Sequence, residues 1–302
     1  PKEDVTVTVT YVQRDFAIGY YDGNTSPKEK ATIANSSATL THGRIYNVVE
    51  TGQYQITTPE IYVEPDAGYQ IKSVIGKYTN AVGAPATIEF VTSPSDLVAG
   101  GVYTYKMPAS NVDFTITFEE INYAITLDPA IDLNGKAKVL IKGVNGIISN
   151  AIYNSEVTVN VTPELGYEVD DVKVINNTTG LDVTVNDPNT IAKGGNFTFA
   201  MPDSAVTVQV IISPVEYAIS YNTPANGTIT DNDLKKDNTL EAKFTATPAT
   251  GYQIDKVEAS YQDQFGKDAK LTLTASQNDV TKATTYTYQM PASDVAVNVT
   301  FK

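Results

Sequence analysis

Apolar and polar residues alternate strictly in four stretches of the chain. Valine, isoleucine or an aromatic residue fills every second position in 5–11, 112–118, 206–212 and 295–301. This period of two is typical of a β-strand that turns one face to a core. Valine, threonine and tyrosine dominate the remaining segments, and no ten-residue window has a convincing helical period of 3.6. The pattern predicts an all-β protein.

Two short motifs recur in step with three of these strands. Gly-Tyr is followed by Met-Pro 35 to 39 residues later, and a proline stands three residues before each Gly-Tyr. The copies are Gly68-Tyr69 with Met107-Pro108, Gly166-Tyr167 with Met201-Pro202, and Gly251-Tyr252 with Met290-Pro291. A period near 90 residues indicates an array of small domains. We predict three tandem small β modules in an elongated array, each β-sandwich-like or, alternatively, β-grasp-like.

The spacing of the strands sets the predicted boundaries. An aromatic-Ala-Ile triplet opens each repeat five residues after the last apolar position of the preceding strand. The modules are therefore 14–120, 121–213 and 214–302, joined by linkers of about four residues (119–122 and 213–216). Residues 1–13 read as the terminal strand of a truncated upstream repeat. We expect Val5–Tyr11 to lie along an edge of the first module or to pair with another copy.

The motif residues have structural explanations, so we predict that they specify the fold. Glycine before tyrosine permits a positive φ or a bulge between strands. Tyrosine supplies a large apolar body with a polar tip, methionine fills an irregular gap, and proline ends a ladder. The fold-specifying set is Gly68, Tyr69, Met107, Pro108, Gly166, Tyr167, Met201, Pro202, Gly251, Tyr252, Met290 and Pro291.

The order of these motifs resembles the divergent relatives of the internalin B-repeat family, which occur in tandem on bacterial surface and secreted proteins. The third repeat has Thr247-Pro248, Gly251-Tyr252, Met290-Pro291, Asp294-Val295 and Phe301 at the family's positions. The family's tryptophan is replaced by Val74, Val172 and Val257. The resemblance covers essentially the whole chain in three copies. It implies surface display in extended arrays and no catalytic residues.

An insertion in the first repeat supplies the candidate binding site. Ile18 and Pro65 are 47 residues apart, whereas the equivalent Ile219 and Pro248 are 29 apart. The added residues fall at about 22–46. Insertions into repeats often map to a functional face, and tyrosine and arginine are favoured at interfaces. The tentative ligand-binding residues are Tyr20, Tyr21, His42, Arg44 and Tyr46, although a neutral insertion explains the same length difference.

Composition narrows the chemistry further. The 302 residues include no cysteine, one histidine and only two arginines, with a net charge of −14. A nucleophilic triad and a histidine or thiolate metal site therefore lack their residues, and a nucleic-acid partner lacks its basic surface. No apolar run is long enough to cross a membrane. We predict no enzyme and no cofactor. Weak calcium binding stays open at Asp231-Asn232-Asp233 with Asp237, at Asp170-Asp171 and at Asn186-Asp187, although none has the spacing of a dedicated loop.

We therefore expect a non-enzymatic spacer, stalk or display scaffold of a bacterial cell-surface or secreted protein. Its expected partners are the neighbouring repeats, its expected state is a monomer, and its signal and anchor are expected outside this segment. The alternative is an adhesin segment that binds host glycan or protein, most plausibly through the insertion. The absence of tryptophan weakens the glycan version, although tyrosine could substitute. A stalk cross-linked by Lys–Asn isopeptide bonds is a third hypothesis.

Overall fold

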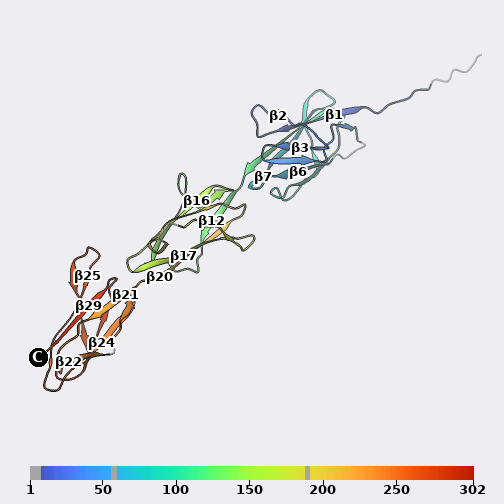
Figure 1. Cartoon of the computed structure of the whole chain (residues 1–302). Helices are drawn as coiled ribbons and strands as arrows, with labels where there is room; N and C mark the ends of the chain where they lie inside the picture. The colour runs from blue at the N-terminus through green and yellow to red at the C-terminus, as the bar shows by residue number, and fades with distance from the viewer. Residues whose placement is uncertain (1–7, 56–59, 188–190, 231) are drawn as a thin grey trace, which may run out of the picture. The chain divides into compact units, whose positions relative to one another are not determined.

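Each repeat of the chain builds two β-sheets from its own strands (Figure 1). The structure is a computed structural model that describes residues 8–55, 60–187, 191–230 and 232–302. Apart from one 3-10 turn, η1 (Ile191–Lys193), the regular elements in these ranges are all strands. The all-β prediction is therefore confirmed.

The first repeat places its long strands in the middle of two sheets. One sheet has the order β2-β1-β11-β7-β8, with β5 also paired to β1, and the other has the order β3-β4-β6-β10-β9. The strands are β1 (Asp15–Asp22), β2 (Glu29–Lys30), β3 (Ser37–Leu40), β4 (Gly43–Tyr46), β5 (Thr51–Gln53), β6 (Glu60–Pro65), β7 (Tyr69–Thr79), β8 (Pro85–Thr87), β9 (Phe90–Thr92), β10 (Gly101–Tyr105) and β11 (Val112–Glu120).

The second repeat has the sheets β15-β12-β20-β17-β18 and β14-β13-β16-β19. Its strands are β12 (Asn122–Leu127), β13 (Ala137–Gly143), β14 (Gly146–Ile147), β15 (Asn150–Ile152), β16 (Glu156–Pro163), β17 (Tyr167–Asn176), β18 (Asp182–Val183), β19 (Gly195–Ala200) and β20 (Val206–Pro214).

The third repeat has the sheets β23-β21-β29-β25-β26 and β22-β24-β28-β27. Its strands are β21 (Glu216–Tyr221), β22 (Gly227–Thr230), β23 (Lys235–Asp237), β24 (Glu241–Pro248), β25 (Ile254–Gln262), β26 (Asp268–Lys270), β27 (Thr274–Ala275), β28 (Thr284–Gln289) and β29 (Val295–Phe301).

One topology serves all three repeats. The first strand of a repeat runs parallel to its last strand, which is antiparallel to the strand that follows Gly-Tyr. The alternating strand thus lies in the middle of its sheet, and its apolar face is buried. In β11 these buried side chains are Val112, Phe114, Ile116 and Phe118. They share one core with side chains of β4, β6 and β10 from the other sheet, so the first repeat is a sandwich of two sheets.

The motif residues lie at equivalent places in the three repeats. The glycines of the Gly-Tyr motif have φ values of +84°, +90° and +88°, which glycine adopts without the steric penalty of a side chain. Met107, Met201 and Met290 are at most 2% exposed. Both observations agree with a role in specifying the fold. The tyrosines are less uniform, because Tyr69 and Tyr167 are half-buried while Tyr252 is exposed.

The expected four-residue linkers need correction, whereas the expected pairing of Val5–Tyr11 stays a prediction, because part of this segment lies outside the described residues. Residues 8–14 form no strand, and Tyr11 and Val12 are exposed; Val5 and Val7 lie outside the described residues. The edge beside β1 is already occupied, because β5 and β2 of the same repeat pair with it. The expected four-residue linkers are also absent. Only Ile121 separates β11 from β12, and only Val215 separates β20 from β21.

Contacts divide the chain into two compact units, a coarser division than the three predicted modules. One unit holds residues 1–123, 150–155 and 201–204, and the other holds the rest. The sheets nevertheless take all their strands from within single repeats.

Candidate functional site

The insertion of the first repeat adds one strand to each sheet. β2 pairs with β1, and β3 pairs with β4, so the inserted chain passes from one sheet to the other. The insertion is shorter than predicted. Gly43 of β4, Ala137 of β13 and Gly227 of β22 each pair with the proline that precedes their Gly-Tyr motif, which makes these strands equivalent. The added residues are therefore about 23–42, and Arg44 and Tyr46 belong to a strand that every repeat has.

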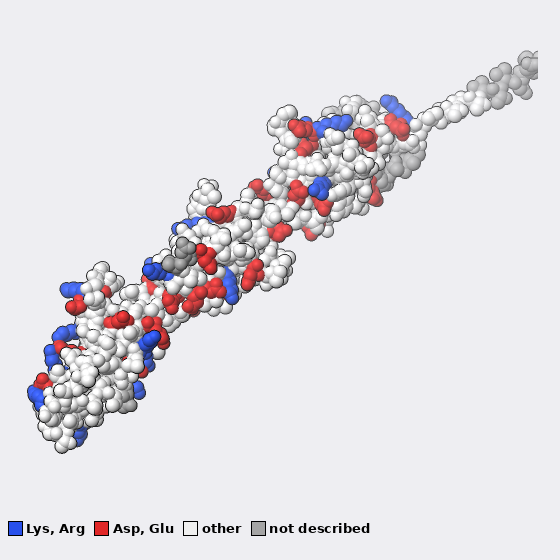
Figure 2. Space-filling view, viewed as in Figure 1, with Lys and Arg blue, Asp and Glu red and all other residues white. Residues whose placement is uncertain are grey.

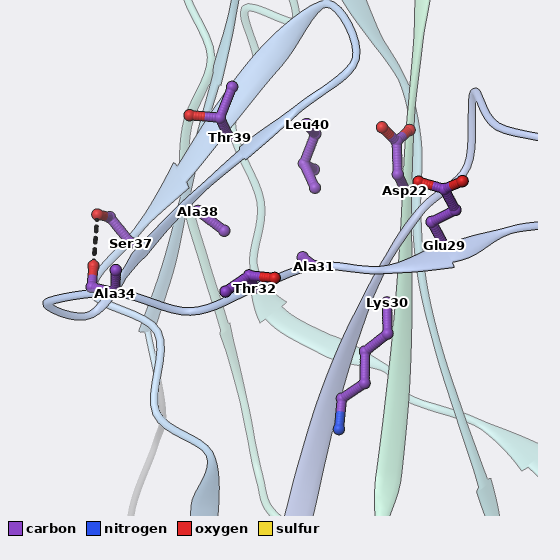
Figure 3. Close-up of a pocket in the computed structure, with 10 residues that line it drawn as sticks. All are labelled: Asp22, Glu29, Lys30, Ala31, Thr32, Ala34, Ser37, Ala38, Thr39 and Leu40. Atoms are coloured by element: carbon purple, nitrogen blue, oxygen red, sulfur yellow. Dashed lines mark hydrogen bonds between the residues drawn. The ribbon is translucent and has the colours of Figure 1, made fainter.

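A pocket of about 430 Å³ opens between β2, the connection after it and β3 (Figure 3). Its lining residues are Asp22, Glu29, Lys30, Ala31, Thr32, Ala34, Ser37, Ala38, Thr39 and Leu40. Most of the polar groups come from exposed residues, and Ser37 donates its hydroxyl to the Ala34 carbonyl. The pocket can accept a small polar molecule by hydrogen bonds.

Asp22 is the buried carboxylate of this pocket, with 6% exposure. Both of its oxygens already accept backbone N–H groups, one from Asn24 and one from Thr41. A buried carboxylate is stable only when its oxygens are satisfied in this way. Asp22 therefore holds the two ends of the insertion together.

The structure separates the five predicted ligand-binding residues. The prediction that Tyr20 binds a ligand was wrong, because its ring is buried against Phe114 and its hydroxyl donates a hydrogen bond to the Val49 carbonyl. Burial raises the pKa of this phenol far above its usual range, so it stays neutral. Tyr21 is the next residue of the same strand β1, opposite Lys30 of β2, and this sheet does not contain β4 with Arg44 and Tyr46.

His42 occupies the turn between β3 and β4 with a φ of +72°. Its ring stacks on Tyr69 of the Gly-Tyr motif, with ring centroids 4.0 Å apart and planes 10° apart. The pKa of Tyr69 is raised, first by desolvation and then by the carboxylate of Glu120. The stack gives His42 a packing role. It also directs the His42 ring towards Tyr69 and away from the other candidate residues.

Arg44 and Tyr46 are the two candidates that the structure brings together. They lie on the same outward face of β4, where they alternate along the strand with the buried Gly43 and Ile45. The pKa of Arg44 is raised, mainly by the neighbouring Tyr46 hydroxyl. Sequence reasoning missed the neighbour of Tyr46 on the next strand. Tyr62 of β6 lies directly opposite, with ring centroids 6.0 Å apart.

Catalytic groups are not assembled in the part of the chain that the structure describes. The carboxyls with a shifted pKa are Asp132, Asp255, Glu258 and Asp279, and all four pKa values are lowered. Glu258 is half-buried and the other three are exposed. Hydrogen bonds from nearby donors are the main cause, followed by an adjacent lysine charge. A general acid needs the opposite shift. Acidic and basic side chains are interspersed on the face shown in Figure 2, and no continuous basic stripe crosses that face.

The oxygen-rich loops are used in local structure. Asp233 accepts the backbone N–H of Lys243 and lies 3.6 Å from the Lys236 ammonium, while Asp237 caps the turn at Thr239. Asp231 lies outside the described residues. Within the described ranges, no three or more His, Asp or Glu side chains converge as metal ligands. The described ranges also include no helix long and apolar enough to span a membrane.

Two of the lysines that form ion pairs are largely exposed. Lys72 pairs with Glu119 at 3.3 Å and Lys302 with Asp255 at 2.7 Å, and both lysine side chains are largely exposed. A lysine becomes nucleophilic at neutral pH when burial lowers its pKa, so these exposed, paired amines are poorly placed for isopeptide formation.

Comparison with known proteins gives one family match. Residues 217–302 match the model described as the divergent InlB B-repeat domain, which covers less than a third of the chain. No curated protein matches the chain. One similar solved structure is titled "Crystal structure of tetra-tandem repeat in extending region of large adhesion protein", with 10% identity and a TM-score of 0.15 over 95% of this chain and 74% of that one. That likeness is too weak to carry an argument. The family match agrees with the sequence-based resemblance over the third repeat, which is similar to the divergent InlB B-repeat domain.

Proposed function

We propose that this chain is a non-enzymatic spacer within a bacterial surface or secreted protein, built from three separately folding β-sandwiches. The observation that carries the proposal is the construction of the two junctions. Ile121 is the only residue between β11 and β12, and its N–H donates to the carbonyl of Gly68 at 2.9 Å. Val215 has the same place, and its N–H donates to the carbonyl of Gly166 at 2.8 Å.

These bonds give the Gly-Tyr motif a second role. The positive φ of the glycine turns the chain into the next strand and also presents its carbonyl to the junction residue. A junction of one residue with a bonded N–H has few free torsions, whereas a flexible linker needs several unbonded residues. Limited bending at each junction is the property that a spacer requires.

Two further observations support the non-enzymatic part. The three repeats share one order of central strands, and a catalytic centre would require residues that depart from it. The family of the third repeat supports a place on the bacterial surface or in the secreted fraction.

The width of distance distributions between spin labels tests the spacer role. The chain has no cysteine, so paired cysteines can be labelled cleanly at the exposed Val82 and Val144 on either side of Ile121. We expect a narrow, single-peaked distribution. A matched variant with six glycine and serine residues inserted after Ile121 should give a broad one. A native distribution as broad as that of the insertion variant would refute the spacer.

The junction hydrogen bond can be tested separately across Val215. Val215→Pro removes the donor, and Val215→Ala is the matched control that keeps it. With labels at Val144 and Phe265, the proline variant should broaden the distribution and the alanine variant should not. Equal widths in the two variants would show that the bond does not limit bending.

The second candidate function is adhesion to a host glycan or protein through the insertion. The observation that favours it is the polar pocket between β2 and β3. Thr32→Tyr would block this pocket from an exposed position. Adhesion to host cells that is lost in this variant would support the candidate, and unchanged adhesion would remove the pocket from consideration.

A further inference from the structure

Three side chains form an apolar row on the outer face of the first repeat. Tyr46 of β4 lies opposite Tyr62 of β6, and Tyr62 lies opposite Val102 of β10. The two rings are half-buried, Val102 is 36% exposed, and all three point away from the core residues of their strands. The row therefore runs across the strands on a surface that the described residues leave uncovered.

The same row has a different character in the other repeats. In the second repeat it is Leu140, Asn160 and Asn196, and the two amides are hydrogen-bonded at 2.8 Å. In the third repeat it is Thr230, Thr245 and Thr285, and the last two hydroxyls are hydrogen-bonded at 2.9 Å. Polar side chains that hydrogen-bond to each other satisfy their own donors and acceptors on the sheet surface without a ligand. The fold thus has no need of tyrosines here, which points to a role other than stability.

Polar side chains flank the row on both sides. Arg44 and Glu64 lie opposite each other on one side, and Glu60 and Thr104 lie opposite each other on the other. Arg44 is the one cation among these flanking residues, and the carboxylates of Asp66 and Glu64 act on it electrostatically. Acidic groups therefore outnumber it on this face, and the chain's charge of −14 repels an anionic ligand at long range.

The size of the row distinguishes between classes of ligand. It crosses three neighbouring strands and so spans two strand spacings, which makes it about 10 Å long and about 7 Å wide. One more spacing reaches the polar Ser37 on β3. A stable protein interface needs about 800 Å² per partner, several times this footprint. A narrow apolar strip with hydrogen-bonding groups along both sides fits a short linear ligand whose faces are apolar and whose edges are hydroxylated.

We propose that the outer sheet face of the first repeat binds a neutral oligosaccharide, with Tyr46 and Tyr62 stacked against sugar faces and Arg44, Glu64 and Thr104 bonded to its hydroxyls. This inference is independent of the spacer role, since a spacer can carry a binding face. It also places binding outside the insertion pocket. Three of the five groups, Tyr62, Glu64 and Thr104, are absent from the sequence-based candidate set, and the other two were placed there for the insertion.

The test uses the full chain and six neutral linear hexasaccharides, namely those of α-1,4-glucose, β-1,4-glucose, β-1,3-glucose, β-1,4-mannose, β-1,4-xylose and β-1,4-N-acetylglucosamine. We expect calorimetry to find at least one with a dissociation constant at or below about 1 mM. Tyr46→Leu with Tyr62→Asn installs the second repeat's residues, which this fold accepts, and should weaken binding at least about tenfold. Tyr54→Ala, which removes an exposed tyrosine outside the row, should not change it.

Three results would overturn the proposal. One is that none of the six hexasaccharides binds at a concentration tenfold above the expected dissociation constant of about 1 mM. Another is binding that the Tyr46→Leu and Tyr62→Asn variant leaves unchanged. The third is a sulfated heparin hexasaccharide that binds more tightly than every neutral one. Thermal unfolding of the variant, unchanged from the native chain, would establish that any loss comes from the face and not from misfolding.

Discussion

Replacing Met107 by alanine tests how the Met-Pro motif stabilises a repeat. The side chain of Met107 is 1% exposed and belongs to the core of the first repeat. Its carbonyl accepts the N–H of Gln55, a backbone bond that alanine keeps. The substitution therefore removes side-chain packing alone. Truncation of a buried methionine costs about 2–4 kcal/mol when the surroundings cannot collapse into the cavity.

The environment of Met107 gives this prediction a second, sharper part. A methyl group added at Gly52 of β5 would lie 3.3 Å from the Met107 Cγ and 3.4 Å from the Ile18 Cδ1. Gly52→Ala alone should change stability by less than about 1 kcal/mol, because slight crowding opposes the entropy that glycine loses in a strand. In the Met107→Ala background the same methyl enters the cavity. We expect it to restore about 1 kcal/mol there, so that the two sites are coupled.

Hydrogen exchange measured by mass spectrometry is the appropriate assay, because it reports each repeat separately. Peptides from the first repeat should lose protection by an amount equal to about 2–4 kcal/mol, and those from the third repeat should keep theirs. Met107→Leu is the control and should cost less than about 1.5 kcal/mol. An equal loss in all repeats would refute independent folding. A Gly52→Ala effect that is the same in both backgrounds would refute the packing argument.

Further expectations concern buried tyrosines and the insertion. Tyr105→Phe should leave the thermal stability of the first repeat unchanged or raise it slightly, because the hydroxyl of Tyr105 is buried without a hydrogen-bond partner. Phe199 occupies the equivalent place in the second repeat. A loss of more than about 1 kcal/mol in the free energy of unfolding would contradict this prediction. Burial is the main reason why the pKa of Tyr288 is raised to about 12, above that of an unfolded tyrosine near 10. Its neutral form therefore stabilises the third repeat below about pH 10, and this contribution should fade as the pH rises towards 12. Hydrogen exchange should show this loss in the native chain and not in the control variant Tyr288→Phe. Asp22→Ala should release the backbone of residues 23–42 to exchange, because it removes the acceptors of Asn24 and Thr41, while leaving the core strand β11 protected.

The recurring motifs were a sound guide to the fold because each copy acts locally. A glycine with positive φ, a buried methionine and an alternating strand require the same backbone wherever they occur. Their order also predicted the family model that matches the third repeat. The linkers were predicted too long for a physical reason. Strand residues continue to within one position of each other, and the bond from Ile121 to Gly68 joins residues more than fifty positions apart. A pattern read along the chain does not reveal such a pairing.

The same limit explains which part of the candidate site was missed. Length comparison showed that the first repeat has extra residues, but it could not show that they end at about residue 42, since only the pairing of Gly43 with Pro65 fixes that point. Tyr20 and Tyr46 look alike in sequence. Strand register then places one in the core and the other on the surface, because successive side chains alternate between the two faces of a strand. Tyr62 and Val102 join Tyr46 only across strands, at separations of 16 and 56 positions. A surface that is assembled across strands in one repeat and replaced by bonded polar pairs in the others is visible only after the three registers are superimposed, and that contrast is the reason to look for a ligand on the first repeat.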